Sequence, residues 1–233
     1  MKSVAIFRHS PTEGAGYFAT FLDAHRVPWR VVRVDAGEQV PANPNEFSGL
    51  VFMGGPMSVN DDLPWIRDEL ILINKAVDAD IPVLGHCLGG QLMSKALGGV
   101  VTRNRVKEIG WGRVAVADSA AAREWFGATR EFSGFHWHME TFTIPPKAVH
   151  IAESQYCANQ AFVLGKHLGM QCHVEMTPAL IRKWCEEWQR ERVPKAWPSV
   201  QTPAQMLERL DERASGLNKI ADRLYERWIE GLA

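Results

Sequence analysis

The chain has 233 residues, a formal net charge of −1, 46% hydrophobic residues and 23% charged residues. This length suits one domain with a large core, and the balanced charge gives no electrostatic signature of nucleic-acid binding. Because the amino-terminal apolar run is too short for a signal peptide and no stretch approaches the roughly 20 apolar residues that cross a bilayer, we expect a cytoplasmic protein without membrane or nucleic-acid partners.

The first half of the chain predicts strands that alternate with helices. Apolar strand candidates lie at 4–7, 29–34, 50–53 and 81–84, and the unbroken apolar run at 50–53 is expected to be buried on both faces. Helix candidates lie between and after them, at 17–25, 63–79 and 91–97. Strands linked by helices of this length predict βαβ units, and therefore a mostly parallel sheet with helices on both faces. We expect an α/β fold with a flavodoxin-like central sheet.

The second half predicts a small antiparallel extension of the sheet, followed by helices. Short strand candidates joined by turns lie at 100–101, 113–117, 130–132, 148–152, 161–164 and 168–172. One helix begins at Thr177-Pro178. Another begins at Thr202-Pro203, where Gln205 completes a capping box, and its apolar residues keep a helical period to Trp228.

The Pro/Trp-containing segment 194–203 separates these two helices. We therefore expect residues 1–190 to form an α/β domain and residues 191–233 a helical extension packed on the same domain. The four cysteines show no Cys-x-x-Cys spacing, so neither a disulfide framework nor a metal site is expected.

A single cysteine lies between the fourth strand and the helix that follows it, in Gly85-His86-Cys87-Leu88-Gly89. A nucleophile on such a tight turn is typical of a nucleophile elbow, here with cysteine in place of serine. Backbone N–H groups at the helix start favour a thiolate. The alternative is a buried core cysteine beside a glycine turn, and the motif alone does not decide between them.

A second motif supplies a base and a carboxylate. Near the last strand candidate the chain reads Gln171-Cys172-His173-Val174-Glu175. In extended backbone His173 and Glu175 point to the same side, so Glu175 can orient the imidazole toward Cys87. Carboxyl ends of parallel strands share one edge, where α/β sheets bind ligands. Taken alone, the pair could also be an ordinary structural ion pair.

A third motif, Gly54-Gly55-Pro56, follows a buried strand. Double glycine lets the backbone approach a ligand closely. The N–H groups of Gly55 and Leu88 could then form an oxyanion hole for attack by Cys87. The alternative for this motif is an ordinary Gly-Pro turn.

Together these motifs resemble the class I (triad) glutamine amidotransferase domain, in particular the glutaminase domain of GMP synthetases. The resemblance rests on segments 54–58, 85–91 and 171–175 and covers roughly residues 40–180. It implies that Cys87 forms a thioester, that His173 is the general base and acid, and that Glu175 orients His173.

The resemblance also implies substrate contacts. Gln91 and the backbone around Trp137 and His138 would bind the amino-acid end of the substrate. The chain departs from the family pattern at Val174, where proline is usual, and at Met139, where glycine is usual. These departures affect the expected shape of the pocket and leave the triad intact. No cofactor is expected.

Other histidines are interpreted as packed or exposed residues, since no pair has metal-ligand spacing on a recognisable helix. His86 is adjacent to Cys87 on a sharp turn and is expected to point away from it.

The leading functional hypothesis is a cysteine-dependent amidohydrolase that acts on glutamine or a γ-glutamyl compound, whose possible partner is a separate synthetase subunit. A free-standing γ-glutamyl peptide hydrolase is the first alternative, and a catalytically silent regulatory or binding subunit is the second. A cysteine hydrolase resembling intracellular peptidases fits less well, because Leu88 follows the cysteine where that group has histidine.

Overall fold

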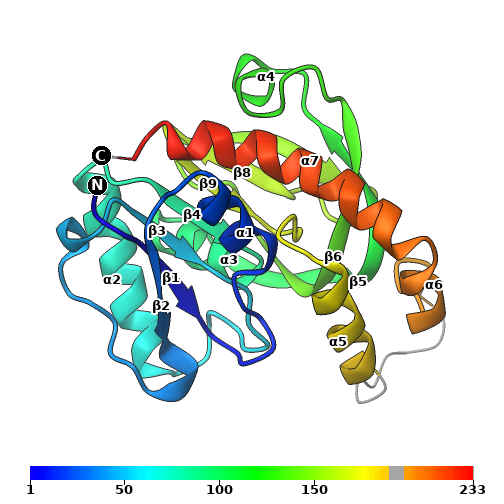
Figure 1. Ribbon diagram of the computed structural model, residues 1–233, viewed down its shortest axis with the longest axis horizontal. Coiled ribbons are helices and arrows are strands. Elements are labelled where there is room, and N and C mark those ends of the chain that lie inside the picture. Colours follow the sequence, from blue (N-terminus) through cyan, green and yellow to red (C-terminus); the bar gives the residue numbers. More distant parts are fainter. Residues whose placement is uncertain (189–196, 233) are drawn as a thin grey trace.

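The computed structural model describes residues 1–188 and 197–232. Within these residues nine strands form one sheet in the order β2-β1-β3-β4-β9-β8-β7-β5-β6 (Figure 1). Five adjacent strands are parallel: β2 (Trp29–Arg33), β1 (Val4–Arg8), β3 (Gly49–Phe52), β4 (Val83–His86) and β9 (His167–Met170). Their order is that of flavodoxin-like sheets, so the predicted α/β class is confirmed.

The antiparallel part is larger than predicted. It comprises β8 (Ala161–Leu164), β7 (Val149–Ser154), β5 (Val101–Val116) and β6 (Glu131–Phe142). The short candidates 100–101, 113–117 and 130–132 were wrong in length, because they only overlap the ends of two long strands, β5 and β6. The pairing of these two strands shifts between Arg103 and Glu108, and the polar stretch there gives no period-two apolar pattern. Helix α4 (Ala120–Phe126) was missed.

Helices cover both faces of the sheet. On one face α1 (Gly16–Ala24) and α7 (Leu210–Ile229) pack together, with Phe18 and Tyr225 edge to face at 4.7 Å. On the other face α2 (Pro64–Asp78) and α3 (Leu88–Ala96) bury their apolar stripes against β3 and β4. Two short 3₁₀ turns, η1 (Val34–Ala36) and η2 (Pro44–Glu46), follow β2. No helix among the described residues is both long and apolar enough to cross a membrane.

The carboxyl-terminal helices differ from the prediction in one respect. α5 (Pro178–Trp188) and α6 (Pro203–Leu207) begin as predicted, and the capping box of Thr202 and Gln205 is present. The predicted continuous helix from Pro203 to Trp228 was wrong, because Arg209 has a left-handed backbone (φ 52°) that separates α6 from α7. Apolar residues keep their spacing across this break, so periodicity did not reveal it. The predicted domain boundary at 190/191, and residues 194–196 of the predicted separating segment, lie outside the described residues.

Candidate active site

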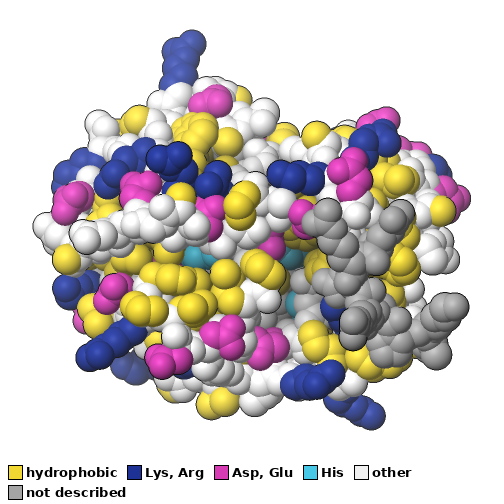
Figure 2. Space-filling model, turned by 90° about the horizontal axis from the view of Figure 1, so that it is seen from below, with side chains coloured by type: hydrophobic (Ala, Val, Ile, Leu, Met, Phe, Trp, Pro, Cys, Tyr) yellow, Lys and Arg dark blue, Asp and Glu magenta, His cyan; other side chains and the backbone are white. Residues whose placement is uncertain are grey.

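Three predicted site segments leave the same edge of the parallel strands. Gly55 follows β3, Cys87 follows β4 and His173 follows β9, and these strands are parallel neighbours. Figure 2 shows a hollow in the middle of this face, with histidine side chains at its bottom. The edge borders a cavity of about 500 Å³ whose lining includes Gly55, Cys87, Gln91, Trp137 and His138. This volume is in the usual range for a small-molecule site.

Cys87 occupies the turn between β4 and α3. Its backbone has φ 51° and ψ −106°, and its N–H donates to the carbonyl of Met170 at 2.8 Å. A non-glycine residue rarely has positive φ, and such strain is concentrated at functional sites. A Cβ on Gly89 would lie 2.0 Å from the carbonyl oxygen of Phe52, so this tight turn requires glycine there. The structure therefore has the strand–turn–helix geometry of an elbow.

His173 and Glu175 form a buried pair. The Nδ1 atom of His173 lies 2.6 Å from Oε1 of Glu175, and each residue is at most 2% exposed. Burial opposes protonation of His173, but the charges of Glu175 and Cys87 outweigh it and raise its pKa well above the usual value. Burial also opposes ionisation of Glu175, but His86 and His173 lower its pKa to about 2. The structure therefore favours an imidazolium at His173 beside the Glu175 carboxylate.

The backbone around this pair is fixed from two sides. The N–H of His173 donates to the carbonyl of Phe135 in β6 at 2.8 Å, and the carbonyl of Glu175 accepts from the N–H of Tyr17 at 2.7 Å. Gly16 has φ 54°, and a Cβ there would lie 2.2 Å from the carbonyl oxygen of Glu175. Glycine is therefore needed where α1 approaches the pair.

Two glutamine side chains connect α3 to the thiol of Cys87 by hydrogen bonds. Gln91 donates to the side-chain carbonyl of Gln171 at 3.1 Å, and Gln171 donates to Sγ of Cys87 at 3.6 Å. The carbonyl of Trp137 lies 3.9 Å from the same sulfur. Sequence reasoning did not assign Gln171 a role, although its position two residues before His173 predicts that both side chains point the same way.

The Gly54-Gly55 loop lies against the start of α3. A Cβ on Gly55 would lie 2.6 Å from Cδ2 of Leu88, which shows how closely the two segments approach. His9 anchors this loop, because its Nδ1 donates to the carbonyl of Met53 at 3.0 Å while its Nε2 pairs with Glu69 at 3.0 Å. Both side chains of that pair are fully buried.

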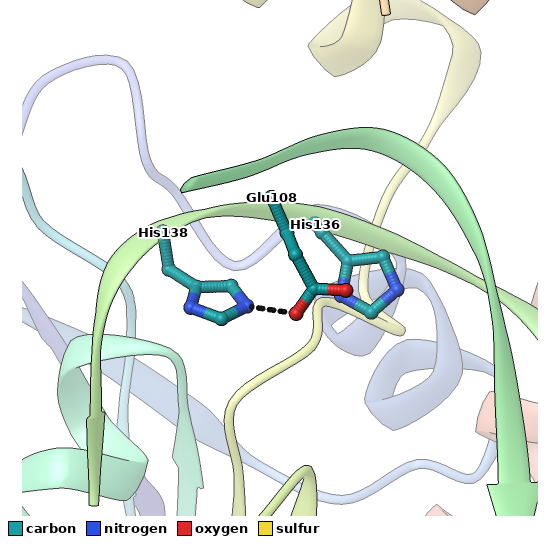
Figure 3. A group of neighbouring side chains, drawn as sticks. All are labelled: Glu108, His136 and His138. Atoms are coloured by element: carbon teal, nitrogen blue, oxygen red, sulfur yellow. Dashed lines mark ion pairs between the residues drawn. The ribbon is translucent and has the colours of Figure 1, made fainter. Parts of the chain in front are cut away.

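His138 on the cavity wall is held by Glu108 of β5. Its Nδ1 donates to the carbonyl of Glu140 at 2.9 Å, and its Nε2 lies 3.0 Å from Oε2 of Glu108. Figure 3 shows Glu108 between His138 and His136. Among the described residues, these three could offer ligand atoms within 4.8 Å of one another.

The carboxylate of Glu108 is already engaged, however. It also accepts hydrogen bonds from Ser154 at 2.9 Å and from Gln160 at 3.0 Å. Burial lowers the pKa of His136 to about 4, so its ring is neutral near pH 7. We interpret the cluster as a structural group of buried polar side chains that fixes the cavity wall at His138.

Two cavity residues come from elements to which sequence reasoning gave no role in the site. The ring of Trp184 in α5 stands edge-on to His173 at 4.9 Å, and its Nε1 donates to the carbonyl of Thr12 at 2.9 Å. Glu13, in the same loop after β1, is half-buried, and a Cβ on Gly54 would lie 2.1 Å from its Oε2. Neither residue belongs to a motif, so the sequence offered no signal for either.

Glu13 gives a pH-dependent prediction. Burial raises its pKa to about 7, against the opposing effect of His173. Between about pH 4.5 and pH 7 the native state therefore holds a proton on Glu13 that the unfolded state has released. The free energy of unfolding falls as the pH rises through that window. Glu13→Gln carries no titratable group at this position. As the pH rises through the window, its free energy of unfolding should increase relative to that of the wild type by on the order of 2 kcal/mol, as measured by chemical denaturation. A difference that does not change with pH would contradict the prediction.

Comparisons with known proteins agree with this geometry. The model of the family Glutamine amidotransferase class-I matches residues 20–183. The glutamine amidotransferase-like protein YfeJ of Salmonella typhimurium (strain LT2) is 33% identical over 194 residues, which cover 78% of this chain and 80% of that protein. One subunit of the glutamine-hydrolyzing GMP synthase of Methanococcus maripaludis (strain C7) is 30% identical over 161 residues, covering 64% of this chain and 78% of that relative.

A solved structure is similar over the whole fold. The crystal structure of a glutamine amido transferase from Methylobacillus flagellatus has a TM-score of 0.98 and 46% identity, covering 100% of this chain and 96% of that chain. The chain spans only 27% of the length of the Vibrio GMP synthases that it also matches. Because the family model covers most of the chain, including all three motifs around the cavity, the chain belongs to the class I glutamine amidotransferase family.

Proposed function

We propose that this protein is a cysteine-dependent amidohydrolase that cleaves the γ-carboxamide of glutamine or of a γ-glutamyl compound. The observation that carries the proposal is Cys87, which lines the cavity and interacts with His173 of the buried His173–Glu175 pair. Family membership, and the relative named as part of a glutamine-hydrolyzing synthase, support a glutamine-like acyl donor.

In the first half of the proposed reaction, the Cys87 thiolate attacks the γ-carbonyl carbon, and the C=O electron pair moves onto the oxygen. The N–H groups of Gly55 and Leu88 stabilise that oxyanion. His173 gives its Nε2 proton to the leaving nitrogen, so the C–N bond breaks, ammonia or an amine departs, and the γ-glutamyl thioester remains on Cys87.

Water completes the cycle. Nε2 of His173 takes a proton from a water molecule while the water oxygen attacks the thioester carbon. The C–S bond then breaks, glutamate leaves, and the thiolate and imidazolium are restored. Glu175 keeps the His173 ring oriented through both halves, and we place the amino-acid end of the donor against Gln91 and the backbone of Trp137 and His138.

The test is a steady-state assay of the purified chain, first alone and then with a separate synthetase, with glutamine and a γ-glutamyl dipeptide as separate substrates. We expect glutamate release from at least one of them. Higher kcat/KM for the dipeptide would identify a free-standing γ-glutamyl hydrolase. Ammonia release only in the presence of a separate synthetase would identify a glutaminase subunit. Failure to hydrolyse either substrate, alone or with a synthetase, would favour a catalytically silent subunit.

A further inference from the structure

Helix α7 reaches the candidate triad through two fully buried side chains. His86 is the last residue of β4, and Tyr225 lies in α7. The hydroxyl of Tyr225 lies 3.0 Å from Nε2 of His86, and the same nitrogen lies 3.7 Å from Oε2 of Glu175. Neither His86 nor Tyr225 lines the cavity, so this contact approaches Glu175 from outside the substrate site.

One carboxylate oxygen of Glu175 has no hydrogen-bond partner among the described residues. The Oε1 atom is bound by His173, whereas Oε2 is buried and accepts no hydrogen bond from the residues that the structure describes. Leaving a buried charged oxygen unsatisfied costs free energy, so such atoms call for a partner. The Nε2 atom of His86 faces it at ion-pair distance, slightly beyond hydrogen-bond range.

The protonation states of the two partners follow from their surroundings. Burial lowers the pKa of His86 despite the nearby Glu175, so its ring is neutral near pH 7. Burial, reinforced by Glu175, raises the pKa of Tyr225 well above its usual value, so the phenol keeps its proton. A proton on Nε2 of His86 would face both the carboxylate and the phenol oxygen.

The other tautomer of His86 is less favourable. It would turn a nitrogen lone pair toward the Glu175 carboxylate and would leave a buried N–H without a partner, because Nδ1 makes no hydrogen bond to any described residue. Unpaired buried N–H groups are rarer than unpaired buried acceptors. The geometry therefore favours a proton on Nε2 of His86, which lies 3.0 Å from the Tyr225 hydroxyl and 3.7 Å from Oε2 of Glu175.

We propose that His86 and Tyr225 are positioning residues, in which His86 holds the Glu175 carboxylate against His173 and Tyr225 holds the His86 ring. The inference rests on the proposed function, in which Glu175 orients His173. It makes α7 part of the framework of the active site, whereas the sequence predicted only a packed extension.

The test compares four single variants and one double variant by kinetics and by the proton and nitrogen resonances of the His173 ring, which report its hydrogen bond to Glu175. His86→Leu is expected to lower kcat about tenfold with KM nearly unchanged, and to weaken the deshielded Nδ1 proton signal, because the carboxylate is no longer fixed. His86→Gln, which keeps an N–H donor, should restore most of the loss. Tyr225→Phe should lower kcat about threefold alone and have no further effect in His86→Leu, because it acts through His86.

Tyr17→Phe is the matched control. It removes a hydroxyl that binds Asp222 of α7 at 2.7 Å and keeps the backbone N–H that binds the Glu175 carbonyl, so it alters the docking of the helix without touching His86. We expect unchanged kcat and an unchanged His173 signal. An unchanged signal in His86→Leu, additive effects in the double variant, or the same loss in Tyr17→Phe would overturn the inference. If the wild type hydrolyses no γ-glutamyl substrate, the proposed function fails, and the resonances of His173 still decide the positioning role.

Discussion

Cys87→Ala is expected to lower kcat/KM for a γ-glutamyl amide by at least about 10⁴-fold, the scale seen when a triad nucleophile is removed. In the proposed reaction the Cys87 sulfur forms the bond to the γ-carbonyl carbon, and alanine has no electron pair to replace it. Residual turnover would come from the oxyanion donors and substrate binding alone. Glutamate and ammonia release by the purified variant measures the loss.

Covalent labelling gives the same prediction an independent measurement. A glutamine analogue with an electrophilic side chain should modify Cys87 in the wild type, and glutamine should protect it. Cys185→Ala is the matched control, since Cys185 is also buried but lies on α5 and does not line the cavity. It should keep both labelling and activity. Labelling elsewhere, or a Cys87→Ala variant that keeps a tenth of the activity, would contradict the assignment of Cys87.

The parallel half of the fold was predictable because its signals are local. β1, β3 and β4 are short and mostly buried, so an unbroken apolar run overlaps each of them (4–7, 50–53 and 81–84), and the glycines around Cys87 mark the turn. The long strands β5 and β6 were not predictable in the same way. In these strands buried and exposed residues do not alternate regularly, so the sequence shows no apolar face. Their pairing is set by contacts between residues distant in the sequence.

In the candidate site, too, the residues in local motifs were predicted and those brought together only by the fold were not. Cys87, His173 and Glu175 were predicted because each belongs to a short motif at a strand end. Glu13 and Trp184 were missed, because a loop near the amino terminus and a late helix meet at the cavity only in the folded chain. His86 does not line the cavity, and its ring contacts Tyr225, which is 139 residues away in the sequence. A single sequence carries no information about such a pair.

His173→Gln is the second change expected to have a large effect, with kcat lowered by about 10⁴-fold. Both halves of the proposed reaction use Nε2 of His173, first to protonate the leaving nitrogen and then to activate water. A glutamine amide can still approach Glu175 but cannot exchange a proton near neutral pH. The matched control is His150→Gln, because His150 lies on β7 away from the cavity, and this variant should keep full activity.

Glu175→Gln tests the orientation of the His173 ring separately from the proton transfer that His173 performs. Without the carboxylate, only Cys87 opposes the effect of burial on His173, so the pKa of His173 falls and a smaller fraction of its ring is protonated. We expect a loss of about 10³–10⁴-fold, no greater than that of His173→Gln, because the ring can still accept a proton. Profiles of kcat/KM against pH check this order. If Glu175→Gln cost more than His173→Gln, or if His173→Gln kept a hundredth of the activity, the roles assigned to the two residues would be wrong.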